Sequence, residues 1–155
     1  MEWFNKTFAA LGTEELYQIV QLRQQVFVVE QNCVYLDADG YDRAALHLFA
    51  VQQGCVVAYC RLLPPGLKYQ EASIGRVCTA LAQRGSGLGR ELMQRALTLA
   101  AASYSSGGER SDLHTEIRIS AQLYLQNFYS SLGFSAVSAP YDEDGIPHIE
   151  MLFSA

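Results

Sequence analysis

Hydrophobic positions recur at two different intervals along this chain of 155 residues. In three segments they return every three to four residues, which is the spacing of a helix with one buried face. These segments predict helices at 13–27, from the glycine run at 85–89 to about Ala102, and at 121–132. Seven shorter segments are mostly apolar or alternate between apolar and polar residues, as strands do: Trp3–Phe8, Ala45–Val51, Cys55–Leu63, Ala72–Thr79, His114–Ser120, Phe134–Val137 and Ile146–Phe153.

The predicted order of elements is βαβββαβαββ. Strands and helices alternate only in the second half, so we expect an α/β (α+β) fold with a mixed sheet instead of a purely parallel one. Gln52-Gln53-Gly54 predicts a hairpin turn, and Gly75-Arg76 inside a strand predicts a bulge or a close backbone approach. Thr13 is a candidate N-cap, and Gly133 suits a left-handed helix C-terminus. The polar, glycine-rich segment 103–112 predicts a mobile surface loop.

Composition and charge narrow the class of protein. Half of the residues are hydrophobic and 17% are charged, which is typical of a globular chain and not of a disordered one. A net charge of −5 argues against nucleic-acid and anionic-membrane partners and is compatible with a cationic substrate such as an amine. No signal peptide and no apolar run near ~18 residues stand out. We therefore expect one cytoplasmic domain over residues 1–155, and the sequence leaves open a homodimer.

No metal site is expected. The polar loop at 33–43 lacks the spacing of a calcium loop, because Tyr41 stands at a ligand position counted from Asp37 and no Glu closes the loop. The four cysteines lack the spacing of zinc ligands and are interpreted as free thiols: Cys33, Cys55, Cys60 and Cys78.

A glycine-rich segment, Gln83-Arg84-Gly85-Ser86-Gly87-Leu88-Gly89, joins a predicted strand to a predicted helix. Three glycines within five residues leave the backbone bare, so a ligand can approach its amides closely. The first N–H groups of the helix have no partner within it and carry the positive end of its dipole, which favours an anion such as a pyrophosphate. The structural alternative is a tight turn without a ligand. The spacing excludes a P-loop, and Arg90 stands where a dinucleotide fingerprint needs its third glycine.

The spacing Arg84-x-x-Gly87-x-Gly89 resembles the acyl-CoA pyrophosphate loop of the GNAT superfamily of N-acyltransferases. A second segment, Tyr129-Ser130-Ser131-Leu132-Gly133-Phe134, resembles a family motif and follows at the right order and separation. The two together are far more specific than either alone, and the resemblance covers residues 3–153. Smaller blocks at 26–33, 74–77, 120–122 and 144–151 are similar to the ElaA-like subgroup.

The resemblance implies a single-domain GNAT fold: a mixed, mostly antiparallel sheet with helices on both faces, splayed between two central parallel strands near Val77 and Ile119. The pantetheine arm of acetyl-CoA would lie in that gap, hydrogen-bonded by the backbone of Val77, Cys78 and Thr79. The pyrophosphate would be bound by Arg84, Gly85, Ser86, Gly87, Leu88, Gly89 and Arg90. The family usually has Asn seven residues before its tyrosine. Here that residue is Gln122, which leaves a cofactor contact and a substrate contact both open.

The same resemblance implies that Tyr129 is the general acid for the departing thiolate. A phenol with a pKa near ~10 suits an alkyl thiolate of similar basicity. The alternative for Tyr129 is an ordinary half-buried helix residue. A backbone N–H near Cys78 could polarise the acetyl carbonyl.

No general base is unambiguous in the sequence. The candidates are Glu30, Asp39, His148 and Glu150, and a water chain could replace any of them. His148 and Glu150 lie two apart on one strand and so share a face, where a His–Glu pair could accept a proton near neutral pH. The alternative for His148 is a strand-end histidine with a structural hydrogen bond. His47, inside an apolar run, is interpreted as a core histidine with satisfied hydrogen bonds.

These residues predict an acetyl-CoA-dependent N-acetyltransferase that acts on a primary amine of a small molecule or peptide by direct attack on the thioester. The alternative is an acyl-CoA-binding module or sensor without turnover. The amine would enter opposite the cofactor, between the loop at 35–39 and the last strand. We expect its contacts to come from Glu30, Tyr35, Asp39 and Gln122, at an acidic mouth that attracts cations.

Overall fold

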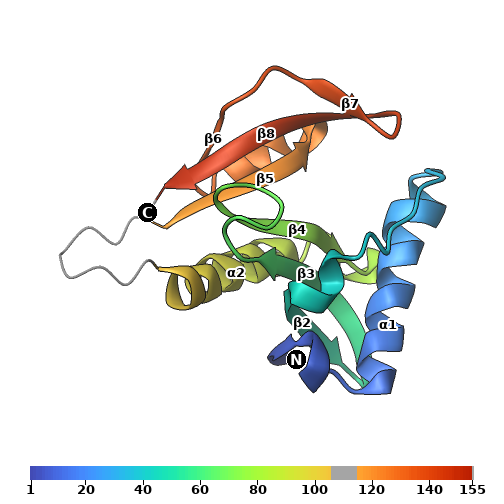
Figure 1. Cartoon of the computed structure of the whole chain (residues 1–155). Helices are drawn as coiled ribbons and strands as arrows, with labels where there is room; N and C mark the ends of the chain where they lie inside the picture. Colours follow the sequence, from blue (N-terminus) through green and yellow to red (C-terminus); the bar gives the residue numbers. More distant parts are fainter. Residues whose placement is uncertain (106–114, 155) are drawn as a thin grey trace.

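The computed structural model describes residues 1–105 and 115–154, which form a central sheet with helices packed on it (Figure 1). The strands are β1 Glu2–Thr7, β2 Leu46–Gln52, β3 Cys55–Leu63, β4 Ala72–Thr79, β5 Glu116–Gln122, β6 Phe134–Ala136, β7 Tyr141–Glu143 and β8 Ile146–Ser154. The α-helices are α1 Thr13–Arg23, α2 Leu88–Tyr104 and α3 Gln126–Ser130. A π-helical segment, η2 Gln24–Glu30, continues α1, and short 3-10 turns occupy η1 Phe8–Ala10, η3 Tyr41–Ala44, η4 Leu81–Gln83 and η5 Leu123–Leu125.

The sheet runs in the order β1-β2-β3-β4-β5-β8-β6, and β7 also pairs with β8. All pairs are antiparallel except β4 with β5, which is parallel, so the predicted mixed sheet is confirmed. The parallel pair is short, with Ala72 opposite Ile117 and Ser73 opposite Arg118. Beyond Ser73 the strands β4 and β5 separate, and Figure 1 shows the two halves of the sheet opening away from each other. The predicted splay between the central parallel strands is therefore confirmed.

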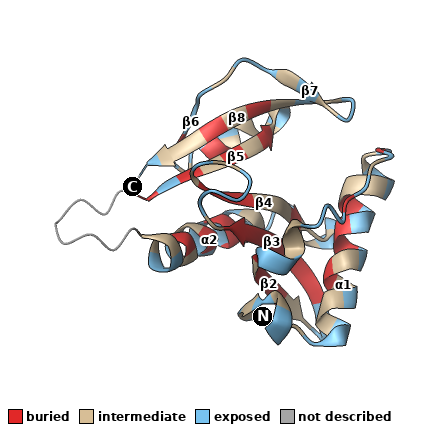
Figure 2. Ribbon diagram, in the orientation of Figure 1, coloured by how far each residue is buried: buried red, intermediate tan, exposed pale blue. Residues whose placement is uncertain are grey.

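Helices cover both faces of the first half of the sheet, as predicted. Strand β2 alternates its side chains between two cores: Phe49 packs with Ile19 and Val26 of the first helix, whereas Leu48 packs with Leu92 of α2. Figure 2 shows buried residues concentrated along the strands and on the sides of the helices that face them. On each face of the sheet, the apolar side of a helix packs against every second residue of the strands. This is the packing that the two hydrophobic intervals predict.

The bulge expected at Gly75-Arg76 is present in β4. The register with β3 shifts between Tyr59 and Arg61, and Arg76 has a φ of 53°, in the left-handed region. The hairpin turn is also as predicted, with Gln53 and Gly54 both at positive φ, as a two-residue turn between twisted strands requires.

Three local predictions need correction. Strand β5 runs to Gln122, because the inward alternation of Ile117, Ile119 and Ala121 continues, so the predicted helix at 121–132 shrinks to η5 and α3. The acidic composition of residues 141–145 predicts a turn, but Tyr141–Glu143 forms a short strand, because its backbone pairs with β8 although its side chains show no apolar pattern. Gly12 takes the N-cap in place of Thr13, since its N–H donates to Glu15 Oε2 at 2.8 Å. Most of the predicted loop at 103–112 and residue 114 lie outside the described residues.

Candidate active site

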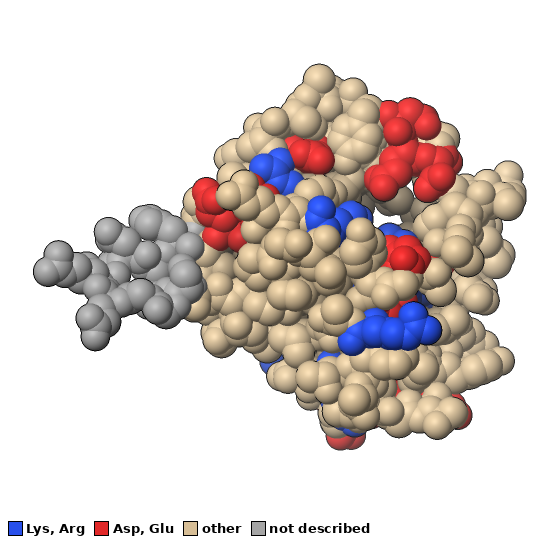
Figure 3. Space-filling model, viewed as in Figure 1, with Lys and Arg blue, Asp and Glu red and all other residues tan. Residues whose placement is uncertain are grey.

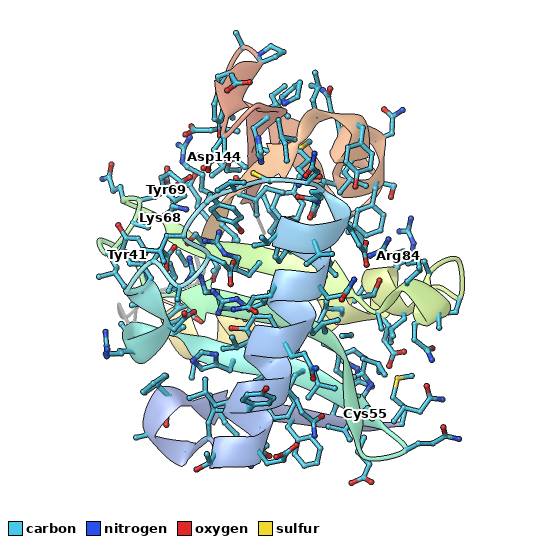
Figure 4. All side chains as sticks on the ribbon, turned by 90° about the vertical axis from the view of Figure 1, so that its right-hand side faces the viewer. Tyr41, Cys55, Lys68, Tyr69, Arg84 and Asp144 are labelled. Atoms are coloured by element: carbon cyan, nitrogen blue, oxygen red, sulfur yellow. The ribbon has the colours of Figure 1, made fainter. Side chains whose placement is uncertain are left out.

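A cavity of about 720 Å³ occupies the gap between β4 and β5. It extends to both sides of the C-terminal end of the first helix: Figure 4 shows Arg84 on one side, and Lys68, Tyr69 and Asp144 on the other. We call the first side the glycine-loop end, lined by Arg84, Gly85, Gly87, Gly89 and Arg90. We call the second side the hairpin end, because the β7–β8 hairpin forms part of its wall. It is lined by Lys68, Tyr69, Glu143, Asp144 and His148.

The glycine-loop end is built mainly from backbone. Gly85 and Gly87 have φ of 78° and 88°, which a residue with a side chain rarely adopts, and Gly87 is the N-cap of α2. No atom lies within 4 Å of the place where a side chain would begin on Gly85, Gly87 or Gly89. The loop therefore presents bare backbone at the positive end of a 17-residue helix.

Two residues of the loop face away from the cavity. Ser86 Oγ donates to Gln83 O at 2.6 Å, which closes the turn before the helix. Leu88 is buried in the core shared by α2 and the sheet, so it anchors the start of the helix. These two residues of the predicted pyrophosphate site shape the loop through their side chains, and their cofactor contact stays a prediction.

Both arginines of the loop have protein partners. Arg84 donates to Glu30 Oε2 at 2.7 Å, and Arg90 donates to Ser131 Oγ at 2.8 Å. Glu30 was predicted at the substrate, but it lines the cavity beside Arg84, at the glycine-loop end. A carboxylate in this place competes with an incoming anion for the guanidinium.

Tyr129 lines the cavity and is only 6% exposed. Its ring packs edge-on against Phe134, with 5.8 Å between the centroids, which fixes its orientation. Burial, with a contribution from Cys60, raises the pKa of the phenol above its ordinary value. The hydroxyl therefore keeps its proton at neutral pH, as a proton donor must.

The β4 residues Val77, Cys78 and Thr79 also line the cavity. Cys78 and Thr79 pair with β3 on one side, but among the described residues no strand pairs with this stretch on the side of β5. The bulge at Arg76 falls just before it and turns the strand. This end of β4 is thus an open strand edge that faces the cavity.

His148 lies in the cavity wall at the hairpin end, but its partner differs from the prediction. His148 Nδ1 lies 2.7 Å from Ile146 O, so Nδ1 carries a proton and Nε2 is the free acceptor of the neutral ring. Nε2 lies 3.5 Å from Glu143 Oε2. Glu150 instead accepts a hydrogen bond from Arg118 at 2.8 Å and does not line the cavity. The predicted His148–Glu150 pair is therefore not formed, and Glu143 is the carboxylate beside the imidazole.

The sequence profile of the family described as "Acetyltransferase (GNAT) domain" matches residues 27–154. The chain belongs to the GNAT acetyltransferase family. A crystal structure of an acyl-CoA N-acyltransferase from Pseudomonas aeruginosa superposes with a TM-score of 0.89 at 42% identity, over 99% of each chain. That of Escherichia coli ElaA gives 0.87 at 38% identity, again over 99% of each chain. A UPF0039 protein of Synechocystis is 40% identical, over 99% of this chain and 95% of its own.

These relatives confirm the predicted GNAT family and its ElaA-like subgroup. The family is one of acyl-CoA N-acyltransferases. The open β4 edge and the glycine loop line one cavity in this chain, and their contacts with a cofactor stay a prediction. In the described part of the chain, no helix is long and apolar enough to span a bilayer. Within the same residues, no group of three or more His, Cys, Asp or Glu side chains could hold a metal ion.

Asp39, predicted at the acceptor of this GNAT protein, belongs to a buried ion network instead of the cavity wall. Arg61 contacts Asp39 at 2.5 Å and Asp42 at 2.9 Å, while Arg23 contacts Asp42 at 2.7 Å and Asp37 at 2.8 Å. Burial alone would raise the pKa of Asp39, but hydrogen bonds and charge from Arg61 outweigh it and lower the pKa to about 2. The network ties the loop that follows the first helix to the sheet. A substrate contact for Asp39 stays a prediction.

The other predicted substrate residues line the cavity. Tyr35 donates to Asp37 at 3.0 Å, and burial raises the pKa of its phenol. Gln122 donates to Gln31 at 3.1 Å, and Gln31 donates back at 3.4 Å, so two amides bridge the end of β5 and the turn after η2. The interpretation of His47 as a core histidine is confirmed: it is fully buried, with Nδ1 at 2.8 Å from Tyr59 Oη and Nε2 at 2.9 Å from Asp42 O.

Sequence reasoning missed Lys68, Tyr69 and Gln31 as residues of this cavity. Lys68 and Tyr69 come from the loop between β3 and β4, where nothing but their position after Pro64-Pro65-Gly66 marks them. A signal did exist for Gln31, since it lies in one of the blocks similar to the ElaA-like subgroup. The acidic mouth is also smaller than predicted: Glu30, Glu143 and Asp144 line the cavity. The other acidic residues expected there do not: Asp37, Asp39, Asp142 and Glu150.

Proposed function

We propose that this chain is an acetyl-CoA-dependent N-acetyltransferase that acetylates a primary amine of a small molecule or peptide. The observation that carries the proposal is one continuous cavity. Its lining joins the glycine loop, the open edge of β4, Tyr129 and His148. Acyl transfer from a thioester needs an anion site for the donor, a polarised carbonyl, a proton donor and a proton acceptor, and the cavity has a candidate for each.

In this proposal the residues of the chain bind and orient acetyl-CoA. The glycine loop at the start of α2 and Arg90 receive the pyrophosphate, and Arg84 joins them when Glu30 releases it. The unpaired edge at Val77–Thr79 receives the amides of the pantetheine arm. A backbone N–H near Cys78 donates to the acetyl carbonyl as negative charge develops on its oxygen.

His148 and Tyr129 move the protons. An ammonium group loses one proton to Nε2 of His148, and the neutral nitrogen attacks the acetyl carbon. The N–C bond forms, the C–S bond breaks, and the thiolate takes the proton of the Tyr129 hydroxyl. The second proton of the nitrogen then restores Tyr129 through solvent, so acetyl-CoA and the ammonium become amide, CoA thiol and one proton.

Thiol release from acetyl-CoA across a panel of amines tests the proposal, with Tyr129→Phe and Tyr17→Phe compared. Tyr17 is 67% exposed on the first helix and does not line the cavity, so it is a matched control. We expect Tyr129→Phe to lower kcat by about 100-fold or more with CoA affinity unchanged, since a general acid contributes at least that. Tyr17→Phe should keep wild-type kcat.

Two further outcomes decide between the alternatives. Replacing His148 by Gln should remove the acidic limb of the pH–rate profile, because Gln has no proton to lose in that range. CoA binding without thiol release for any amine would contradict the proposal and favour the non-catalytic sensor. Wild-type kcat in Tyr129→Phe would be consistent with an acetyltransferase but would show that Tyr129 is not its general acid.

A further inference from the structure

The hairpin end of the cavity has walls of opposite charge. On one side the β7–β8 hairpin supplies Glu143, Asp144 and His148. On the other side, β3, β4 and the loop between them supply Arg61, Arg76 and Lys68. Figure 3 shows acidic side chains gathered over the hairpin, with Lys and Arg side chains lower on the same face.

The acidic wall has two carboxylates that no described Lys or Arg neutralises. Glu143 accepts a hydrogen bond from Ser120 at 3.0 Å, lies beside the imidazole of His148 and is 44% exposed. The carboxylate of Asp144 has no hydrogen bond or ion pair with any described residue. The backbone of Asp144 holds it in place, because its carbonyl accepts from Cys33 Sγ at 3.4 Å. Both carboxylates can therefore attract an ammonium group to the place where His148 takes its proton.

The basic wall also has an unpaired charge. Arg76 is paired with Asp37 at 2.7 Å, and Arg61 is paired with Asp39 and Asp42. Lys68 differs, since its Nζ has no hydrogen bond or ion pair with any described residue. Desolvation and the repulsion of Arg61 and Arg76 lower the pKa of Lys68, and the charges of Glu143 and Asp39 oppose that change. Arg61 Nε, moreover, is buried without a partner among the described residues.

The positive charge of Lys68 is not placed for the phosphates of the cofactor. In Figure 4 Lys68 and Tyr69 lie on the opposite side of the first helix from Arg84. Lys68 is also near enough to Glu143 for that carboxylate to stabilise its charge across the hairpin end. A small molecule could therefore meet both walls at once, and its anionic group would lie beside Lys68.

We infer that the acceptor is a small amine that also carries a carboxylate, such as a free amino acid. The inference rests on the proposed function and names the substrate class of that same site. The ammonium group lies against Glu143, Asp144 and His148, and the carboxylate accepts hydrogen bonds from Lys68. The hydroxyl of Tyr69 lies on the same wall, and burial together with Tyr141 raises its pKa to about 12, so it also keeps a proton to donate. A diamine without an anionic group would leave Lys68 facing a second cation.

Matched pairs of acceptors test the inference. Glycine, β-alanine, γ-aminobutyrate, lysine and glutamate are each compared with the corresponding carboxamide, which keeps the amine and removes the negative charge. Binding to the CoA-loaded protein is followed by ligand-observed NMR, and acetylation by thiol release. For at least one pair we expect the carboxylate form to bind and react about tenfold or more better, as expected for a hydrogen bond to a charged group.

Variants of the two lysines locate the effect. Lys68→Gln should remove the preference for the carboxylate, and Lys68→Arg should restore most of it. Lys6→Gln is the matched control, because Lys6 pairs with Glu15 outside the cavity, and it should keep the preference. Binding with the predicted preference but without thiol release would support the inference while contradicting the transferase. Equal use of both members of every pair, no binding of any carboxylate form, or an unchanged preference in Lys68→Gln would overturn it.

Discussion

The two ends of the cavity are built by different means. The glycine-loop end consists mainly of backbone from one continuous segment, with glycines at positive φ and the first turn of α2. The hairpin end consists of side chains from separate segments: the β3–β4 loop, β4 and the β7–β8 hairpin. Behind it lies a network of three arginines and three aspartates.

This difference sets what each end can recognise. A site built from backbone suits a ligand group that is the same in every reaction, such as a pyrophosphate. Few substitutions can change such a site without disrupting the turn that forms it. A site made of side chains can change its specificity residue by residue on the same strands. The fixed end thus suits a common donor, and the variable end suits a particular acceptor. Four experiments test the contrast, and the one with the largest expected effect comes first.

Replacing Arg23 by Met should lower the free energy of unfolding by about 3–5 kcal/mol, because it removes a buried guanidinium that pairs with both Asp37 and Asp42 and leaves each carboxylate with one arginine. Urea denaturation measures the change. Arg95→Met is the control: the Arg95–Glu91 pair is nearly half exposed, so its loss should cost below about 1 kcal/mol. If the two ends are independent, folded Arg23→Met binds CoA as the wild type does. An equally small effect for both variants would mean that the network does not support the hairpin end.

Replacing Gly87 by Glu should weaken CoA binding by about 100-fold or more, because a carboxylate would meet the pyrophosphate. Calorimetry with CoA gives the affinity. Gly54→Glu is matched in backbone strain, since Gly54 has a φ of 78° in the β2–β3 turn, away from the cavity. Both variants should lose about 1–2 kcal/mol of stability, and only the first should lose affinity. Wild-type affinity in Gly87→Glu would contradict the assignment of this end to the cofactor.

The pH dependence of stability tests the ion network through Asp39. Its pKa falls from 3.8 to about 2 on folding, so its ionised form stabilises the folded state above about pH 4. Because Asp39 is partly exposed, solvent screening should limit that contribution to about 1 kcal/mol, and it is lost as the pH falls from about 4 to about 2. Asp39→Asn should therefore unfold at lower urea than the wild type at neutral pH, and the gap should narrow over that range. Glu116→Gln removes an exposed carboxyl as the control and should leave a constant, small difference.

Replacing Glu30 by Gln should tighten CoA binding two- to fivefold, the smallest effect of the four. Arg84 is 41% exposed, and a pair of this kind contributes about 1 kcal/mol at most, which the cofactor no longer has to displace. Calorimetry at two salt concentrations measures it, and the gain should shrink as salt rises. Weaker binding in this variant would instead place Glu30 among the groups that hold the cofactor.

The same contrast explains how far the sequence could be interpreted. The glycine spacing and the segment from Tyr129 to Phe134 carry the resemblance to the GNAT family, so the fold and the glycine-loop end could be predicted from that resemblance. The partner of His148 could not, because Glu143 reaches it through pairing of β7 with β8, and the acidic segment shows no strand pattern. Lys68 could not be predicted either, since its place in the cavity depends on where a loop folds over two strands.

The open edge of β4 has a consequence for the integrity of the molecule. A strand with unpaired N–H and C=O groups is a template for pairing with another chain, and proteins usually blunt or hide such edges. Here the edge faces the cavity between β4 and β5, and the left-handed Arg76 bends the strand. A strand of another chain therefore cannot pair with this edge, although a narrow ligand could still reach it through the cavity. Loss of the second half of the sheet would therefore uncover this edge and make it a starting point for aggregation.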